Sequence, residues 1–278
     1  MRIALLQVEA EPLDVNANLE TLRAGAEAAR DAGAELVLTP ELFITGYAPV
    51  ALRDWLPEND VTSIQQRVAQ VAASTETGIV TSYPRRQDDG SITISAGFWA
   101  ADGRQLLSYD KVHLWGEEER TTFAAADAPA QVVDWRGWNV GLQICYDIEF
   151  AEPARHLASR GANLVLVPTA IDSTAHYVPD ILIPARAAEN GVVVAYADHP
   201  ASARVAAGGD PVSFAGNSLV ASWDGSVLGR AGADSQLLIV ELPSPDSVPG
   251  PESNYLRDRR GELYAAWAES DLPRRTAP

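Results

Sequence analysis

Three residues of types that cooperate in nucleophilic catalysis each follow an apolar stretch of the chain. Glu41 follows ELVLTP, Lys111 follows LLSYD and Cys145 follows NVGLQI. A thiolate is a good nucleophile, but a free thiol is largely protonated at neutral pH and needs a base. Glu41 could take the thiol proton, and Lys111 could lower the pKa of the thiol and then stabilise an oxyanion. Taken singly, each residue also fits a structural role: an inert buried thiol, a solvated lysine and a helix cap.

These residues lie at the ends of predicted strands, in a chain where strands and helices alternate. Apolar runs bounded by turn residues predict strands at 2–8, 35–39, 79–83, 92–100, 106–109, 138–144, 164–167, 192–197, 218–223 and 227–229. Amphipathic spacing predicts helices at 16–32, 64–74, 153–160 and 181–190. In α/β sheets, chemistry usually takes place beyond the carboxyl ends of the strands, so side chains at neighbouring strand ends can converge there.

Two hairpins indicate that the fold has two similar halves. Asp102-Gly103 and Asp224-Gly225 each join two predicted strands, in the stretches AGFWAADGRQLL and GNSLVASWDGSVLG. Hairpins mixed with strand–helix–strand units predict an α/β protein with mixed sheets. No linker divides the sequence, so we expect residues 1–278 to form one domain. Residues 243–278 are rich in Pro, Ser, Asp and Arg and are expected to wrap the body or a partner.

The composition limits the partners that the protein can have. The 278 residues include 21 Lys and Arg against 38 Asp and Glu, a formal charge of −17. This charge disfavours nucleic acid and anionic membranes, and no run is long and apolar enough to span a bilayer. The one cysteine excludes an intrachain disulfide and a multi-cysteine metal site. Because the histidines are scattered without a zinc-binding pattern, no metal or other cofactor is expected. The N-terminus lacks a signal-peptide pattern, so we expect a cytoplasmic protein.

Three longer motifs, in order along the chain, carry a family resemblance. TPELFITGY (39–47), YDKVHLWGEEER (109–120) and GLQICYDIEFAEPAR (141–155) resemble the signature segments of the nitrilase superfamily of carbon–nitrogen hydrolases. LVLVPTA (164–170) and ARAAENGVVVAYA (185–197) are also similar to that family. The resemblance implies an α/β fold of four layers, an α-β-β-α sandwich with two pseudo-symmetric halves.

The resemblance also implies a role for each matching residue. Glu41 matches the family's general base, Lys111 the lysine that holds the tetrahedral intermediate, and Cys145 the nucleophile. The backbone N–H of Tyr146 matches the second oxyanion donor. The family's second glutamate, eight residues past the lysine, falls on Glu119, the last of three consecutive glutamates. The implied reaction is hydrolysis through a cysteine thioester, without a cofactor.

The residues after the nucleophile indicate a branch of the superfamily. Cys145-Tyr146-Asp147 resembles the amide-hydrolysing branches, whereas nitrilases usually carry Cys-Trp-Glu. The surrounding segment looks most like bacterial aliphatic amidases of the 5-aminopentanamidase type. We therefore expect an amidase that converts small linear amides to carboxylic acids and ammonia. Asp147 is expected to pair with Arg155 for structural reasons.

Several alternatives remain open at this point. An N-carbamoyl amino acid amidohydrolase would need a basic pocket residue for the substrate carboxylate, and Arg186 or Arg204 could serve. A nitrilase of the same superfamily is the other enzymatic alternative. A non-catalytic relative is disfavoured because all three candidate catalytic residues are present. The family usually forms dimers, so we expect a homodimer or larger homo-oligomer in which residues 243–278 take part.

The segment 171–180, IDSTAHYVPD, departs most from the family pattern and follows a predicted strand. Asp172, His176 and Tyr177 are therefore candidates to contact the substrate, and Asp172 could hold the ammonium group of an amino-amide. Tyr47 and Trp115 are candidates for apolar pocket walls. Loop positions without a functional role, or packing in the core, are the alternatives for all five.

Overall fold

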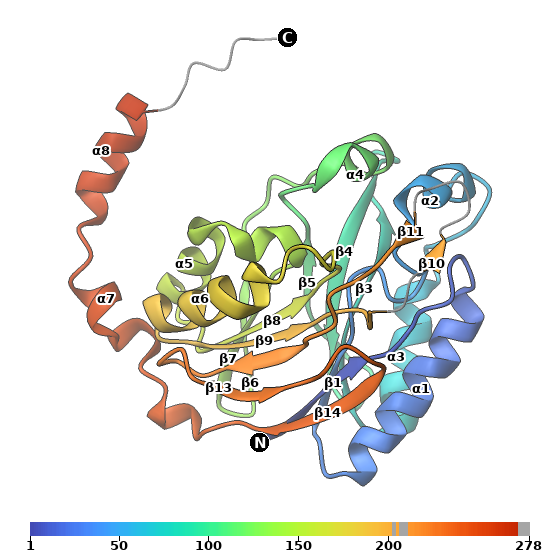
Figure 1. The fold of residues 1–278 in the computed structure, drawn as a ribbon, viewed down its shortest axis with the longest axis horizontal. Helices are drawn as coiled ribbons and strands as arrows, with labels where there is room; N and C mark the ends of the chain where they lie inside the picture. The colour runs from blue at the N-terminus through green and yellow to red at the C-terminus, as the bar shows by residue number, and fades with distance from the viewer. Residues whose placement is uncertain (202–203, 206–210, 272–278) are drawn as a thin grey trace.

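The computed structural model describes residues 1–201, 204–205 and 211–271, and within them two mixed six-stranded sheets face each other (Figure 1). The first sheet has the order β14-β1-β2-β3-β4-β5, and the second has the order β13-β12-β9-β8-β7-β6. The first comprises β1 (Arg2–Gln7), β2 (Leu36–Leu38), β3 (Gly78–Arg86), β4 (Ile92–Trp99), β5 (Gln105–Asp110) and β14 (Gln236–Glu241). The second comprises β6 (Val132–Trp135), β7 (Trp138–Leu142), β8 (Leu164–Pro168), β9 (Val193–Ala197), β12 (Leu219–Ala221) and β13 (Val227–Arg230).

The two sheets share one topology. Strands β1, β2 and β3 are parallel, and β4 and β5 continue the sheet antiparallel. Strands β7, β8 and β9 are likewise parallel, and β12 and β13 continue that sheet antiparallel. Each sheet adds one antiparallel strand at the other edge, β14 beside β1 and β6 beside β7. The two halves predicted from the hairpins are therefore present as matching sheets.

Helices cover the outer faces of both sheets, which completes the four-layer α-β-β-α sandwich that the resemblance implies. Helices α1 (Val15–Asp31) and α3 (Ile64–Thr75) lie on the first sheet, and α5 (Ala151–Ser159) and α6 (Ile183–Asn190) lie on the second (Figure 1). The inner faces meet where β8 contacts β2 and β3, and where β9 contacts β1. Every residue of β8 and β9 is buried, as expected for parallel strands covered on both faces.

Matching glycines let the helices approach the sheets closely. Gly25 of α1 faces Leu6 of β1, and a Cβ at this glycine would lie 2.5 Å from the leucine side chain. In the second half, Gly141 of β7 faces Leu157 of α5, with a corresponding distance of 2.6 Å. Larger side chains at these positions would force the layers apart, because protein interiors are close-packed.

The remaining elements lie at the sheet ends or follow the last strand. Helices α2 (Pro49–Trp55) and α4 (Gly116–Thr122) contact each other, and a π-helical turn, Val178–Leu182, leads into α6. Strands β10 (Arg204–Val205) and β11 (Pro211–Val212) form a short hairpin pair. After two 3₁₀ turns, Pro245–Ser247 and Gly250–Glu252, come α7 (Asn254–Arg257) and α8 (Gly261–Asp271), and α8 extends away from the body (Figure 1). Whether residues 243–278 contact a second copy stays a prediction.

Most predicted elements are present with shifted ends, but eight of the described helices and strands were missed, namely α2, α4, α7, α8, β6, β10, β11 and β14. Helices α2 and α4 are short, and β6 and β14 are edge strands whose partners lie far away or across a tight turn. Edge strands have a weaker apolar pattern because they are less buried. The predicted helix at 181–190 also begins differently, because its first residues belong to the π-helical turn.

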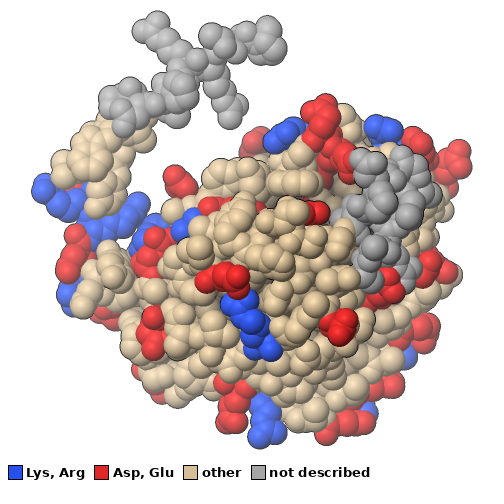
Figure 2. All heavy atoms as spheres, viewed as in Figure 1, with Lys and Arg blue, Asp and Glu red and all other residues tan. Residues whose placement is uncertain are grey.

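Figure 2 shows acidic and basic side chains dispersed over one face of the molecule. None of the helices among the described residues combines the length and the apolar character that crossing a bilayer requires.

Candidate active site

The three residues predicted to cooperate converge where the two sheets meet. Glu41 lies in the loop after β2, Lys111 directly follows β5, and Cys145 begins the 3₁₀ turn Cys145–Glu149 after β7. The backbone N–H of Glu41 donates to the carbonyl of Thr169, just beyond β8, at 3.0 Å. This bond ties a strand end of one sheet to a strand end of the other.

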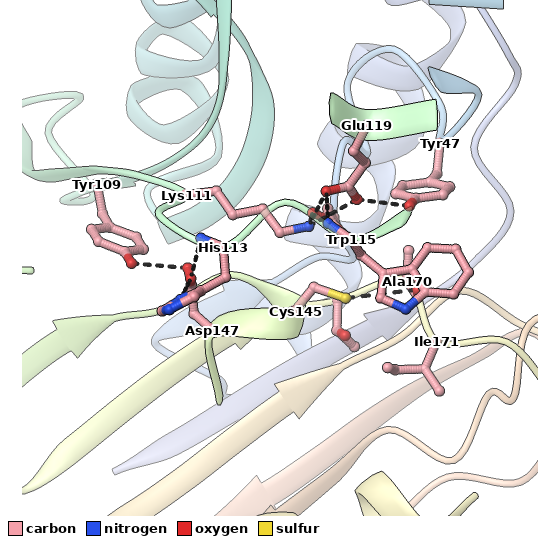
Figure 3. Close-up of polar contacts among 12 residues, drawn as sticks. Tyr47, Tyr109, Lys111, His113, Trp115, Glu119, Cys145, Asp147, Ala170 and Ile171 are labelled. Atoms are coloured by element: carbon pink, nitrogen blue, oxygen red, sulfur yellow. Dashed lines mark hydrogen bonds and ion pairs between the residues drawn. The ribbon is translucent and has the colours of Figure 1, made fainter. Parts of the chain in front are cut away.

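The Lys111 ammonium lies between two carboxylates. Its Nζ is 2.7 Å from Oε1 of Glu41. It is also 2.8 and 2.7 Å from Oε1 and Oε2 of Glu119 (Figure 3). All three side chains are fully buried. Buried charges of this kind persist only when they are paired and hydrogen-bonded. The lysine is therefore held in one position by groups that favour its charged form.

Glu119 is the carboxylate that fixes this arrangement. It accepts a hydrogen bond from the hydroxyl of Tyr47 at 2.7 Å and another from the backbone N–H of Trp115 at 2.8 Å (Figure 3). The preceding Glu117 and Glu118 are exposed. Among three consecutive glutamates, helix α4 thus turns Glu119 toward the lysine.

The backbone of Cys145 is in the left-handed region, with φ of 45°. This conformation is unfavourable for a residue with a side chain, and such strain is concentrated at functional sites. Leu42, which follows Glu41, has φ of 49°. The thiol of Cys145 lies 3.7 Å from the carbonyl oxygen of Ala170 (Figure 3). Sharp turns therefore position both the thiol and the glutamate.

Burial governs the proton affinities at this site. It raises the pKa of Glu41 from its ordinary 4.5 to about 8, against the opposing effect of Lys111. It also raises the pKa of the Cys145 thiol well above its ordinary value, and Glu41 adds to that rise. Burial alone would lower the pKa of Lys111, but the carboxylates of Glu41 and Glu119 raise it by more. The resting site thus holds a thiol, an ammonium and a carboxyl group that titrates near neutral pH.

One oxygen of Glu41 is free to exchange a proton. Oε1 accepts from Lys111, whereas Oε2 is buried without a hydrogen-bond partner among the described residues. Cys145 is close enough to affect the pKa of Glu41. Unpaired buried polar atoms are rare, and this one belongs to the carboxyl group next to the thiol.

A pocket of about 250 Å³ leads to the thiol. Four predicted substrate-contacting residues line it, namely Tyr47, Trp115, Asp172 and Tyr177, together with Cys145, Glu118, Glu149, Ala170, Ile171, Ala175 and Phe214. His176 is exposed and is not among the lining residues. Asp172 uses Oδ1 to accept from the backbone N–H and hydroxyl of Thr174, at 2.8 and 2.7 Å. The pocket is thus mainly aromatic and acidic.

Comparison with known proteins identifies the family. The family model described as carbon-nitrogen hydrolase matches residues 2–249. The chain belongs to the carbon–nitrogen hydrolase family. It is 39% identical over 266 residues to a protein of Pseudomonas protegens named hydrolase in pqqF 5'region, covering 95% of this chain and 90% of that one. It is 33% identical over 281 residues to an (R)-stereoselective amidase of Pseudomonas sp., covering 99% and 97%.

A solved structure also resembles this carbon–nitrogen hydrolase over nearly its whole length. The amidase from Nesterenkonia sp. AN1 matches with a TM-score of 0.87 and 39% identity, covering 96% of this chain and 99% of that one. In that structure, a mutant enzyme carries acrylamide attached by Michael addition to its active-site cysteine. The superfamily predicted from the three motifs is therefore confirmed.

Asp147, two residues after the cysteine, has partners that the sequence did not indicate. The predicted pair of Asp147 with Arg155 is wrong, since Arg155 instead contacts Glu189. The fully buried Asp147 carboxylate accepts from the hydroxyl of Tyr109 at 2.8 Å and from the backbone N–H of His113 at 3.0 Å (Figure 3). It therefore ties the loop of the lysine to the turn of the cysteine.

Three further residues shape the site of this hydrolase without having been predicted. His199 contacts the carbonyl oxygen of Glu41 through Nε2 at 2.8 Å, and Phe214 packs against His199 with ring centroids 4.7 Å apart. Glu149 ends the 3₁₀ turn that Cys145 begins, and it lines the pocket. Of the three, only Glu149 could have been proposed from the sequence, because it lies within the motif that contains the cysteine.

The arginines suggested for a substrate carboxylate do not supply a pocket cation in the described structure. Arg186 donates to the carbonyls of Ile148 and Glu149 at 2.9 and 2.6 Å, and to the Glu189 carboxylate at 2.9 Å. Its guanidinium group is therefore committed to holding the turn after the cysteine. The side chain of Arg204 lies outside the described residues. No group of three or more His, Cys, Asp or Glu side chains within the described ranges is arranged to hold a metal ion.

Proposed function

We propose that this carbon–nitrogen hydrolase is an amidase that converts small linear amides to carboxylic acids and ammonia. Cys145 is the nucleophile, Glu41 the general base and acid, and Glu119 the partner that holds Lys111. The observation that carries the proposal is a buried ammonium, fixed between two carboxylates, beside the only cysteine of the chain. A nucleophile, a base with an unpaired oxygen and an oxyanion-stabilising cation are the groups that acyl transfer from an amide requires.

The first half of the reaction forms a thioester. Oε2 of Glu41 takes the proton of the Cys145 thiol as the sulfur attacks the amide carbon. The carbonyl oxygen becomes an oxyanion, to which Lys111 and the backbone N–H of Tyr146 donate hydrogen bonds. Glu41 then gives its proton to the amide nitrogen, the carbon–nitrogen bond breaks, and ammonia leaves.

The second half reverses these proton transfers with water. Glu41, now a carboxylate again, removes a proton from a water molecule that attacks the thioester carbon. The same donors stabilise the second oxyanion. When the carbon–sulfur bond breaks, the proton on Glu41 returns to the sulfur and the carboxylic acid departs. A carboxyl group with a pKa of about 8 suits this alternation, because it binds and releases protons near neutral pH.

The pocket favours an amide over a substrate that carries a carboxylate. An N-carbamoyl amino acid carries a carboxylate, and no Lys, Arg or His is among the residues that line the described pocket. This lining supports an amidase over an N-carbamoyl amino acid amidohydrolase.

The test is an ammonia-release assay with matched substrates. Butanamide, N-carbamoylglycine and butanenitrile are supplied at equal concentration and ionic strength. The proposal expects butanamide to have the highest kcat/KM of the three. A higher kcat/KM for either of the others would replace the amidase proposal by the corresponding alternative.

A further inference from the structure

Glu149 is placed to read the end of the substrate that does not react. It lies four residues after Cys145, and both residues line the same pocket. Its side chain is half-buried, and its backbone carbonyl is fixed by Arg186 at 2.6 Å. A carboxylate on a turn held in this way presents its charge to the pocket from a fixed position.

The Glu149 carboxylate has no ion-pair partner in the described part of the chain. The ion pair of the nearby Arg186 goes to Glu189 at 2.9 Å, and Lys111 is occupied by Glu41 and Glu119. Burial raises the pKa of Glu149, which indicates that its charge is incompletely solvated. A cationic ligand group would supply the missing counter-charge.

The rest of the pocket has the same character. Glu118 also lines it, and Asp172 adds a third carboxylate, although one oxygen of Asp172 is used by Thr174. Aromatic side chains form much of the remaining wall, namely those of Tyr47, Trp115, Tyr177 and Phe214. Carboxylates together with aromatic faces are a favourable environment for an ammonium group. A substrate carboxylate would instead meet like charges without a basic partner.

We propose that Glu149 is a specificity-determining residue that selects amides with an ammonium group at the end remote from the reacting carbon. This inference rests on the proposed amidase function, because it assumes that the amide carbon lies at the Cys145 thiol. It differs from the expectation for Asp172, since Glu149 lies on the turn of the nucleophile, where its carboxylate interacts with the hydroxyl of the neutral pocket residue Tyr177 and still lacks a cationic partner among the described ion pairs.

The test compares three amides of similar length at 0.15 M salt: 5-aminopentanamide, hexanamide and 4-carbamoylbutanoate. They carry a positive, a neutral and a negative end. The native enzyme is expected to favour 5-aminopentanamide over hexanamide at least tenfold in kcat/KM, with the anion slowest. In Glu149→Gln the ratio of the first two should fall to about twofold or less. In Glu149→Lys the preference between cation and anion should reverse.

The matched control is Glu117→Gln, which removes one negative charge from an exposed position outside the pocket. It should keep the native ratio, which separates a pocket effect from attraction by the net charge. Equal kcat/KM values for 5-aminopentanamide and hexanamide in the native enzyme would overturn the proposal without any variant. So would a full ammonium preference in a Glu149→Gln or Glu149→Lys variant whose circular dichroism is native. If no amide is hydrolysed at all, the proposed function itself fails.

Discussion

Lowering the pH from 8 to 6 is expected to reduce kcat/KM for a neutral amide by about 50-fold, if Glu41 must be ionised to act as base. Burial raises the pKa of this carboxyl group to about 8. Half of the molecules are then ready to accept the thiol proton at pH 8, but only about 1% are ready at pH 6. A glutamate with the ordinary pKa of 4.5 would be ionised at both values and would give a flat profile.

The position of the shared proton does not alter this expectation. The Cys145–Glu41 pair can hold one shared proton in two ways, as a thiolate with a carboxyl group or as a thiol with a carboxylate. The number of bound protons is the same in both. The profile therefore reports the first proton lost from the Cys145–Glu41 pair as a unit. Because the pKa of the thiol is raised well above its ordinary value, the thiol by itself would give a midpoint above pH 9.

The assay measures ammonia release from butanamide between pH 5.5 and 9.5 at constant ionic strength. Butanamide has no group that titrates in this range, so changes belong to the enzyme. Circular dichroism at each pH verifies that the fold is retained. An equal kcat/KM at pH 6 and pH 8 would show that Glu41 is not a base with a raised pKa, and a midpoint above pH 9 would show that thiol ionisation, rather than Glu41, controls the rate.

Three other consequences can be measured separately. Lys111→Arg keeps the positive charge but not the compact ammonium group, and it should lower kcat by ~10²–10³; a rate within a few-fold of native would leave the lysine only a long-range role. Glu119→Gln removes one partner of a buried ion pair and should lower the free energy of unfolding by about 3–5 kcal/mol in urea titrations; an unchanged midpoint would contradict the proposed pairing. Burial lowers the pKa of His199 to about 4, so its contribution to stability is complete above pH 6.5 and is lost as the pH falls toward 4, by up to about 3 kcal/mol. Urea titrations of native protein and His199→Gln across this range should differ by that slope, and parallel curves would refute it.

The convergence of Glu41, Lys111 and Cys145 could be predicted because their positions follow from local sequence. Each comes shortly after an apolar strand, and parallel strands place their carboxyl ends at one edge of a sheet. The helix α1 was predicted for a similar reason, since Leu19, Leu22, Ala26 and Ala29 repeat with helical spacing and all four are buried. The hairpins were predicted because the dipeptides Asp102-Gly103 and Asp224-Gly225 favour a tight turn with positive φ at glycine. Both glycines adopt such angles in the structure, 84° and 85°.

Contacts between distant segments could not be predicted in this way. Asp147 was paired with Arg155 because the two are close in sequence, yet its partners Tyr109 and His113 belong to the loop of the lysine. Strand β14 was missed because its partner is β1, at the other end of the chain. The contacts of Asp147 depend on how the two sheets are stacked, and the β14–β1 pairing depends on the return of the chain to the first sheet. Local patterns encode neither.

The pocket wall shows the same limit. Phe214 reaches the site through a bridge to Asp172, a pairing between two loops. The segment 171–180 was correctly expected to border the pocket, but it turns Tyr177 toward the pocket and leaves His176 exposed. The direction of each side chain depends on the π-helical turn that follows, which the apolar pattern of this segment does not predict.

Mass spectrometry of the intact protein can detect the proposed thioester between Cys145 and the acyl part of an amide. Native enzyme is mixed with excess butanamide, quenched in acid within the first turnovers, and compared with Cys145→Ala treated identically. We expect an added butanoyl mass on native protein that maps to Cys145, no adduct on Cys145→Ala, and no ammonia release by that variant. Ammonia release by a folded Cys145→Ala at the native rate would contradict the proposed thioester.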